Sequence, residues 1–213
     1  MMPKVCIINS SIEYLSMFKS FGWDISDDIL KADLVQFTGG SDVSPSLYNS
    51  DRHPTTHCNP DRDKKEQLVF QKAYKMALPI AGICRGGQFI NVMCGGSMWQ
   101  DVNNHAISGT HLASDCETGE IFEVTSTHHQ MMIPAKEGVI RVITAQESTW
   151  RERVHSKKII KINSKEPEDI EALYYPSYRA FCFQPHPEFS GHHELASRYM
   201  GYLDKYFRLK GTK

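Results

Sequence analysis

The chain has 213 residues, with 24 lysines and arginines against 25 aspartates and glutamates, so its formal net charge is −1. With 40% hydrophobic and 23% charged residues, the composition is typical of a folded globular protein and excludes a disordered one. Balanced charge supplies no bulk field for nucleic acid or an anionic membrane, and no apolar run approaches the roughly 20 residues of a membrane span. We therefore expect no nucleic-acid or membrane partner. Because no signal peptide is visible, we also expect a cytoplasmic location.

The first half of the sequence alternates between short apolar runs and helical patterns. The runs predict strands at 5–9, 33–37 and 79–83, and the patterns predict helices at about 11–21, 61–77 and 86–95. Residues 41–62 are rich in proline, serine, asparagine and aspartate, which predicts a loop or lid. We expect Asp61 or Asp63 to cap the second helix and the charged run 61–66 to face solvent.

The second half is dominated by predicted strands. After a loop at about 102–118, strands are expected at 120–126, 138–145, 157–163, 169–175 and 179–184, followed by a helix at about 191–209. Strands that alternate with helices and are then followed by further strands are typical of an α/β sheet with a parallel core and antiparallel additions. We expect one domain over residues 1–213.

The most informative segment surrounds Cys84. A predicted buried strand runs directly into Gly82-Ile83-Cys84-Arg85-Gly86 and then into a helix, which is the layout of a nucleophile elbow with cysteine in place of serine. The strained turn needs small residues two positions before and after the nucleophile, and both are glycine. The N-terminus of the following helix favours a thiolate, and the backbone N–H of Arg85 can face a developing oxyanion.

A thiol nucleophile requires a base, and His186 is the best candidate among ten histidines. It follows a predicted strand, at the edge where α/β sheets carry their sites. Glu188 lies two residues further on and can orient the imidazole through Nδ1–H. Cys84, His186 and Glu188 therefore form a candidate catalytic triad.

These motifs resemble the class I glutamine amidotransferases, whose elbow reads G-x-C-x-G-x-Q. One branch, the γ-glutamyl-γ-aminobutyrate hydrolase group, is more similar still. Its signatures are matched in order by the segments Gly39–Tyr48 (GGSDVSPSLY), Arg62-Asp63, Asn91–Val102 (NVMCGGSMWQDV) and Ser126–Gln130 (STHHQ). The resemblance covers roughly residues 33–189.

The resemblance implies a three-layer α/β fold with a mostly parallel central sheet flanked by helices and with antiparallel additions. It also implies attack of a thiolate on a γ-carboxamide, loss of the amine, and hydrolysis of a γ-glutamyl thioester to glutamate. On this basis Cys84 is the nucleophile, His186 the general acid and base, and Glu188 the orienting carboxylate. Gly40 and Arg85 would supply the oxyanion hole, and Gln88, His128, His129 and Gln130 would bind the glutamyl group.

Two further expectations concern what surrounds the triad. The family commonly carries a larger residue at position 87, so Gly87 predicts added space beside the elbow and a looser helix. The histidines and cysteines at 53, 57, 58, 105, 111 and 116 match no zinc-ligand spacing. We therefore expect no metal and no cofactor.

Three functions remain open from the sequence. The first is a stand-alone hydrolase of a small γ-glutamyl amide. The second is the glutaminase subunit of an amidotransferase that passes ammonia to a separate synthetase or ligase partner. The third is a binding or regulatory module built on an inactive hydrolase. The leaving amine stays undetermined, and a homodimer is a candidate assembly.

Overall fold

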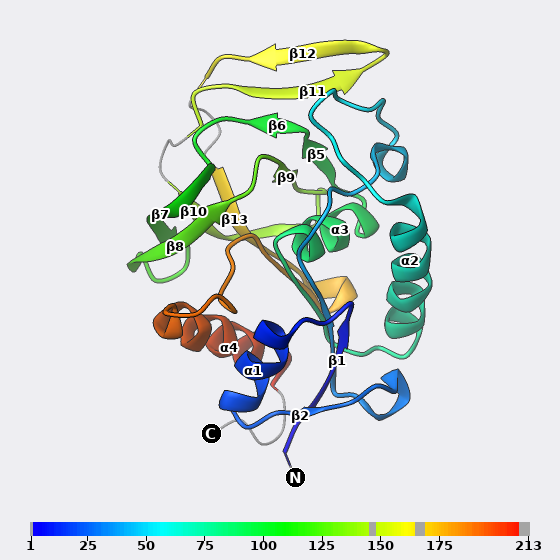
Figure 1. Cartoon of the computed structure of the whole chain (residues 1–213), viewed down its shortest axis with the longest axis vertical. Coiled ribbons are helices and arrows are strands. Elements are labelled where there is room, and N and C mark those ends of the chain that lie inside the picture. The colour runs from blue at the N-terminus through cyan, green and yellow to red at the C-terminus, as the bar shows by residue number, and fades with distance from the viewer. Residues whose placement is uncertain (1, 145–147, 165–168, 209–213) are drawn as a thin grey trace.

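The computed structural model describes residues 2–144, 148–164 and 169–208. A nine-stranded sheet runs through the centre of the molecule in the order β2-β1-β3-β4-β14-β13-β10-β7-β8 (Figure 1). The strands from β2 to β14 pair in parallel, and those from β14 to β8 pair antiparallel. Their bounds are β1 Lys4–Ile8, β2 Asp24–Ile25, β3 Leu34–Phe37, β4 Ile80–Ile83, β7 Ala106–Asp115, β8 Ile121–Thr127, β10 Val139–Thr144, β13 Asp169–Tyr175 and β14 Ala180–Phe183.

Helices cover both faces of this sheet. Helices α1 (Ile12–Ser20) and α4 (His193–Phe207) share a core with one face, while α2 (Pro60–Lys75) and α3 (Arg85–Met93) share a core with the other (Figure 1). Strands β3, β4 and β14 are buried along their whole length, as expected for parallel strands covered on both sides. The predicted three-layer α/β fold with antiparallel additions is confirmed.

Two smaller sheets lie beside the main one. One has the order β12-β11-β6 and the other pairs β5 with β9. Their bounds are β5 Ser97–Trp99, β6 Asp101–Val102, β9 Met131–Ile133, β11 Arg151–His155 and β12 Lys158–Ile162. Short 3₁₀ turns occupy Ile29–Lys31, Pro45–Tyr48 and Pro176–Tyr178. Within the described ranges, no helix has the length and apolar character needed to cross a membrane.

The predicted loop at about 102–118 is wrong. Most of this segment is β7, a ten-residue strand that pairs antiparallel with β8 along its length. Its first residues are exposed on both sides, and an exposed segment does not require the alternation of apolar and polar residues that identifies a half-buried strand in a sequence. Pairing with β8 and β10, and not local propensity, makes this segment a strand.

The expectation for the start of α2 is also wrong. Asn59 caps the helix, with its side chain accepting a hydrogen bond from the backbone of Arg62, and Pro60 is the first helical residue. Asp63 and Glu66 were expected on a solvated face but are 1% and 0% exposed. The predicted ends of one strand at 145 and of the last helix at 209 lie outside the described residues.

Candidate active site

Cys84 stands at the turn between β4 and α3 in a strained backbone conformation, with φ 51° and ψ −118°. Positive φ is uncommon for a residue with a side chain, and such strain clusters at functional sites. The flanking glycines allow the turn. A Cβ on Gly82 would lie 2.3 Å from the carbonyl carbon of Gly86, and one on Gly86 would lie 2.4 Å from the carbonyl oxygen of Phe37. The predicted nucleophile elbow therefore has the geometry that its sequence indicates.

The space expected beside Gly87 is absent. A Cβ at this position would lie 2.9 Å from the backbone nitrogen of Phe183, so the glycine lets α3 pack closely against β14. Helix α3 and β14 are in direct contact, and Gly87 is buried. The prediction of a looser helix is thus wrong, because backbone atoms of β14 occupy the space that a side chain at position 87 would need.

His186 reaches the elbow because β14 lies beside β4. The two strands are parallel, with Phe183 paired with Ile83, so the residues that follow them emerge at the same edge of the sheet. The backbone N–H of His186 donates to Thr125 Oγ1 on β8 at 2.6 Å, which anchors the loop. His186 Nδ1 lies 2.6 Å from Glu188 Oε1.

The electrostatics of His186 suit a thiolate partner. Burial by itself lowers the pKa of His186, but the negative charge of Cys84 and the Glu188 carboxylate raise it to about 10. The imidazolium form of His186 is therefore favoured at neutral pH. Phe189 stacks on the imidazole at a centroid distance of 4.3 Å. The arrangement can run nucleophilic catalysis with His186 as the proton carrier.

The loop after β3 lies at the same edge, since Phe37 pairs with Gly82. A Cβ on Gly39 would lie 3.0 Å from His186 Cε1 and 3.6 Å from Cys84 Cβ. The Gly39 N–H donates to Tyr14 Oη at 2.9 Å. Gly40 has φ +131°, in the region that favours glycine. Of the two glycine N–H groups in this loop, that of Gly40 is the candidate for an oxyanion.

Arg62 holds the loop from the opposite side. Its guanidinium donates to the carbonyl oxygens of Gly39 and Thr38 at 3.0 Å each, and its Nε donates to Glu66 at 2.7 Å. Arg62-Asp63 is one of the motifs that carry the family resemblance, but the sequence did not predict the hydrogen bonds from Arg62 to this loop.

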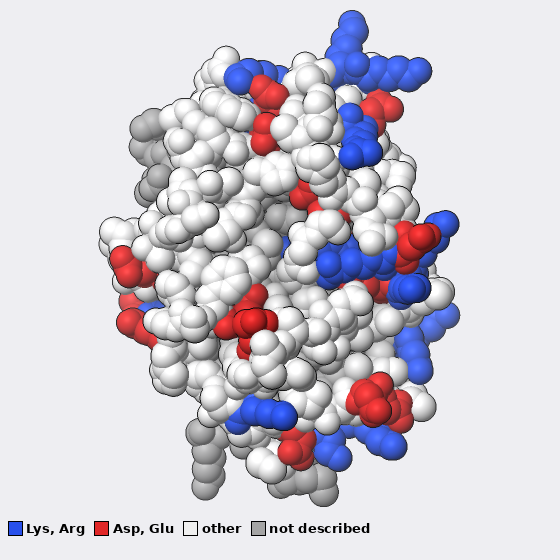
Figure 2. All heavy atoms as spheres, viewed as in Figure 1, with Lys and Arg blue, Asp and Glu red and all other residues white. Residues whose placement is uncertain are grey.

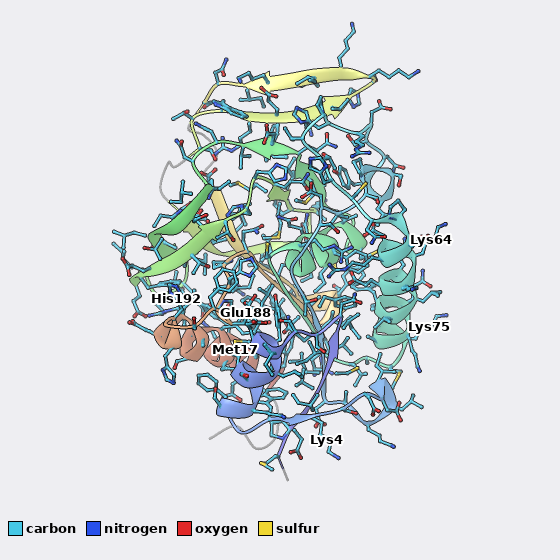
Figure 3. All side chains as sticks on the ribbon, viewed as in Figure 1. Lys4, Met17, Lys64, Lys75, Glu188 and His192 are labelled. Carbon is cyan, nitrogen blue, oxygen red and sulfur yellow. The ribbon has the colours of Figure 1, made fainter. Side chains whose placement is uncertain are left out.

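Arg85 has a second role that sequence reasoning missed. Its side chain is 1% exposed and forms ion pairs with Asp63 and Glu66 of α2. Burial and the neighbouring Arg62 lower the pKa of Arg85 to about 10, while Asp63 opposes the shift. The guanidinium therefore stays charged at neutral pH and joins the start of α3 to α2. Figure 3 shows α2 with Lys64 and Lys75 pointing outward, away from this buried contact.

The residues expected to bind the glutamyl group have other partners in the structure. Gln88 Nε2 donates to the Gln130 carbonyl at 3.2 Å and to Gln184 Oε1 at 3.0 Å. Gln130 Nε2 donates to Thr56 and Gln100. His129 lies between Asp42 and Asp101, each at 3.3 Å.

His128 is 5% exposed and its Nδ1 lies 2.9 Å from the carbonyl oxygen of Gln130. Burial, together with His105, lowers its pKa well below the usual histidine value. A substrate role for Gln88, His128, His129 and Gln130 stays a prediction that these contacts do not support.

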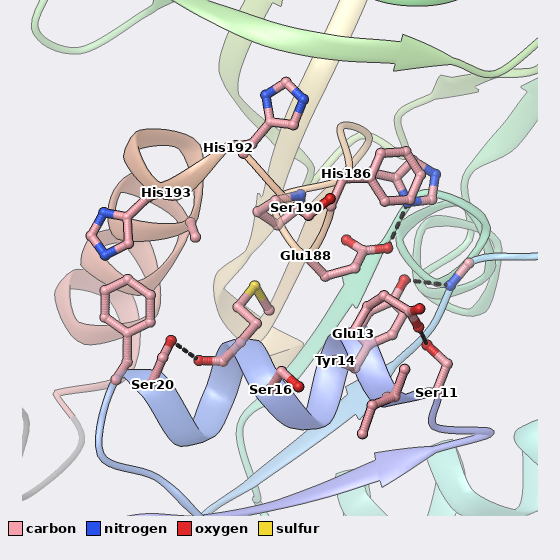
Figure 4. A pocket seen from close by; sticks show the side chains of 18 residues that line it. Ser11, Glu13, Tyr14, Ser16, Ser20, His186, Glu188, Ser190, His192 and His193 are labelled. Carbon is pink, nitrogen blue, oxygen red and sulfur yellow. Dashed lines mark hydrogen bonds and ion pairs between the residues drawn. The ribbon is translucent and has the colours of Figure 1, made fainter.

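A cavity of about 960 Å³ adjoins His186 and Glu188, between α1, α4 and the loop after His186. His186 and Glu188 line one end, Gly39 lies beside them, and Ser16, Met17 and Phe189 are among the other lining residues. Figure 4 shows the Glu188 carboxylate facing Tyr14 across this cavity, with Ser16 on the helix below. Both signs of charge are interspersed over the face of the molecule seen in Figure 2.

Known proteins are similar in sequence to parts of this chain. The glutamine amidotransferase-like protein YvdE of Lactococcus lactis subsp. lactis is 29% identical over 181 residues, covering 65% of this chain and 76% of that protein. Rv2859c of Mycobacterium tuberculosis is 33% identical over 123 residues, covering 48% of this chain and 39% of that protein. Among the first curated relatives, the matched segments span between 31% and 50% of the relative's length.

Solved structures share the fold. A glutamine amidotransferase from Thermotoga maritima superposes with a TM-score of 0.61 at 16% identity, covering 96% of this chain and 84% of that one. The family model for Peptidase C26 matches residues 23–188, which include the elbow, the histidine and the acidic residue. The chain therefore belongs to the Peptidase C26 family of class I glutamine amidotransferase-like proteins.

Proposed function

We propose that this protein hydrolyses a γ-glutamyl amide bond through a γ-glutamyl thioester. The Cys84 thiolate attacks the γ-carbonyl carbon, and the carbonyl oxygen becomes an oxyanion. The C–N bond then breaks, and His186 gives its proton to the departing amine. Water attacks the thioester while His186 takes the proton, so glutamate leaves and the thiolate is restored.

The observation that carries this proposal is the convergence of three loops at one sheet edge. The strained Cys84, the hydrogen-bonded His186–Glu188 pair and the Gly39-Gly40 loop all follow strands that are neighbours in the parallel sheet. In this mechanism the N–H groups of Gly40 and Arg85 stabilise the oxyanion. Glu188 holds the imidazole in the tautomer and orientation that proton transfer requires.

The cavity beside His186 supports a substrate with an amine larger than ammonia. It begins at the residue that protonates the leaving amine, and its volume of about 960 Å³ is ample for a small organic group. Ser11, Glu13 and Ser16 add polar groups among apolar lining residues such as Met17, Phe21 and Phe189. We therefore infer a γ-glutamyl amine as substrate, with the amine in this cavity.

The test is glutamate release by the purified protein alone, measured on glutamine and on a panel of γ-glutamyl amines. We expect turnover of one or more γ-glutamyl amines that exceeds turnover of glutamine. Cys84→Ala is expected to reduce the rate to background, a loss of at least about 10³-fold, while circular dichroism stays unchanged. Retained turnover in Cys84→Ala would reject the proposed nucleophile.

A second candidate has support in the comparisons. The carbamoyl phosphate synthase small chain of Fusobacterium nucleatum is 26% identical over 160 residues, covering 70% of this chain and 40% of that protein. The same site could release ammonia from glutamine for a partner synthetase. Silence on the whole panel, with Cys84 still labelled by a glutamine-mimicking electrophile, would favour this function.

A further inference from the structure

A cluster of titratable side chains outside the proposed triad lies buried between β7, β8 and β13. It consists of His105, which precedes β7, His111 on β7, His128 after β8, and Asp169 and Glu171 on β13. Asp169 and Glu171 are both 0% exposed, as is His105. Because side chains alternate along a strand, residues 169 and 171 share one face of β13. The proposed proton and acyl transfers use none of these groups, and among them only His128 was expected from the sequence to bind substrate.

The outer hydrogen bonds of two histidines set their tautomers. His105 Nε2 lies 2.9 Å from Asp169 Oδ2, so this nitrogen carries the proton and Nδ1 carries the lone pair. His128 Nδ1 lies 2.9 Å from the Gln130 carbonyl oxygen, so its lone pair is on Nε2.

Both lone pairs face the same carboxylate. His105 Nδ1 lies 3.8 Å and His128 Nε2 4.0 Å from Glu171 Oε1, and one atom from each residue lies within 4.8 Å of the others. Three hydrogen-bond acceptors, His105 Nδ1, His128 Nε2 and Glu171 Oε1, thus lie close together in the buried interior. In the described part of the chain, His128 Nε2 and Glu171 Oε2 have no hydrogen-bond partner.

A shared proton does not resolve this arrangement. Separations of 3.8 and 4.0 Å exceed the roughly 3.2 Å limit of a hydrogen bond. His111 Nε2, at 3.0 Å from Glu171 Oε1, supplies one donor to the carboxylate. The Ser126 hydroxyl lies 3.4 Å from His105 Nδ1, but it donates its proton to the His105 carbonyl oxygen at 2.6 Å. Unpaired polar atoms and a buried carboxylate are costly, and a cation among them would remove the cost.

We propose that His105 Nδ1, His128 Nε2 and the Glu171 carboxylate bind a divalent transition-metal ion, with Zn²⁺ as the best match. Imidazole and carboxylate suit zinc, which binds them at about 2.0–2.1 Å. Tetrahedral ligand atoms then lie about 3.4 Å apart, so small side-chain shifts close the site. The hydrogen bonds from His105 to Asp169 and from His128 to a carbonyl are those that metal-bound histidines usually make.

The position of the site gives the ion a structural role. It would tie the segments beside β7 and β8 to β13, and β8 carries Thr125, which anchors the backbone of His186. The inference does not depend on the proposed hydrolase activity. It departs from the expectation of no metal, because the ligands come from three separate segments and show no characteristic spacing in the sequence.

Two rival sites must be separated from this one. The Cys84–His186 pair could bind zinc adventitiously through the thiolate. A second group, His53, Asp101 and Glu152, also brings ligand atoms together. There, however, Glu152 is already paired with His53 at 3.1 Å and with Lys161 at 2.8 Å. Because the Glu152 carboxylate already has these two partners, the His53 group is the weaker candidate for binding a metal ion.

The experiment uses the full chain carrying Cys84→Ala, which removes the thiolate. Protein is stripped with a chelator, reloaded with Zn²⁺ or Co²⁺, desalted, and analysed for metal content by mass spectrometry. We expect about one ion per chain. In this background His105→Gln and Glu171→Gln should lose the ion, and the matched control His53→Gln should keep it. Thermal denaturation should show a higher Tm with Zn²⁺ than without it.

Other outcomes overturn the proposal. They are the absence of stoichiometric metal in the Cys84→Ala protein, retention of the ion in Glu171→Gln, or its loss in His53→Gln. If the His105 and Glu171 variants fail to fold, X-ray absorption of the zinc-loaded Cys84→Ala protein decides instead. Two imidazoles in the ligand shell support the site, whereas one imidazole points to the His53 group and rejects it.

Discussion

The backbone N–H of Gly39 donates a 2.9 Å hydrogen bond to the phenol oxygen of Tyr14. Tyr14 lies on α1 and is only 5% exposed, so this hydrogen bond joins the loop after β3 to a buried side chain of the helix. From the other side, Arg62 binds the carbonyl oxygens of Thr38 and Gly39. The loop is therefore held through both its donor and its acceptors, which leaves the Gly40 N–H to face a substrate in the proposed mechanism.

Tyr14→Phe tests this positioning. The change keeps the ring but removes the acceptor of the Gly39 N–H, and an unsatisfied donor costs about 1–3 kcal/mol. We expect kcat/KM for the best γ-glutamyl amine to fall by roughly 10- to 100-fold, with most of the loss in kcat. The control is Tyr74→Phe on α2, because Tyr74 is 49% exposed and remote from the loop. An unchanged kcat in Tyr14→Phe would show that the loop is positioned without this bond.

The pH dependence should follow the raised pKa of His186. The proposed active form holds a thiolate and an imidazolium, and the pKa of His186 is about 10. Since the protonated imidazole gives its proton to the leaving amine, kcat/KM should fall as the pH rises through about 10. Glu188→Gln removes one of the groups that raise this pKa, so the alkaline limb should move to lower pH.

NMR titration of the His186 ring in the wild type and in Cys84→Ala gives a direct check. Loss of the negative sulfur should lower the pKa of His186, because one of the two groups that raise it is then absent. Equal values in the two proteins would contradict an ion pair between Cys84 and His186.

The buried ion pairs of Arg85 predict a large stability effect. Arg85→Met would remove the ion pairs with Asp63 and Glu66 in a buried environment and leave Glu66 with Arg62 and Asp63 with the backbone N–H of Ser44. Breaking a buried pair in this way typically costs about 3–5 kcal/mol of unfolding free energy. Lys64→Ala, on the exposed side of the same helix (Figure 3), should change it by less than about 0.5 kcal/mol. Urea denaturation of both variants measures the difference; similar midpoints would mean that Arg85 does not stabilise the α2–α3 contact.

The elbow glycines predict a contrast between two glycine-to-alanine changes. In Gly82→Ala the new Cβ would lie 2.3 Å from backbone, which the rigid turn cannot relieve. We expect a loss of more than about 3 kcal/mol or no folded protein. Gly201→Ala has open space within 4 Å and lies inside α4, so it should raise stability by up to about 1 kcal/mol. Thermal denaturation compares them, and a stable Gly82→Ala protein would refute the close packing at the elbow.

Local patterns were sufficient for much of the fold and for the centre of the site. The apolar runs of β4 and β14, and that of β3 around Gln36, predicted strands, and the glycine spacing around Cys84 predicted the strained turn. Histidine and glutamate two residues apart predicted the pair that the structure joins at 2.6 Å. These features depend on neighbours in the chain, so they are visible in it.

Long-range contacts explain what the sequence alone did not predict. Strand β7 exists because β8 and β10 pair with it, and a mostly exposed polar segment gives no apolar pattern. The carboxylates of Asp63 and Glu66 are buried because Arg85, about twenty residues away, compensates their charge. A charged run without that partner would be solvated, which is what its local pattern indicates.

The sequence by itself thus determined the α/β class and pointed to the family and to Cys84, His186 and Glu188 as a candidate triad, because each rests on short motifs with a local physical requirement. Only the tertiary structure decided which polar groups share a buried space. Tyr14 reaches Gly39, Arg62 reaches the same loop, and His105, His128 and Glu171 are brought together by strand order and register. Such meetings are set by the pairing of distant strands, and no spacing along the chain encodes them.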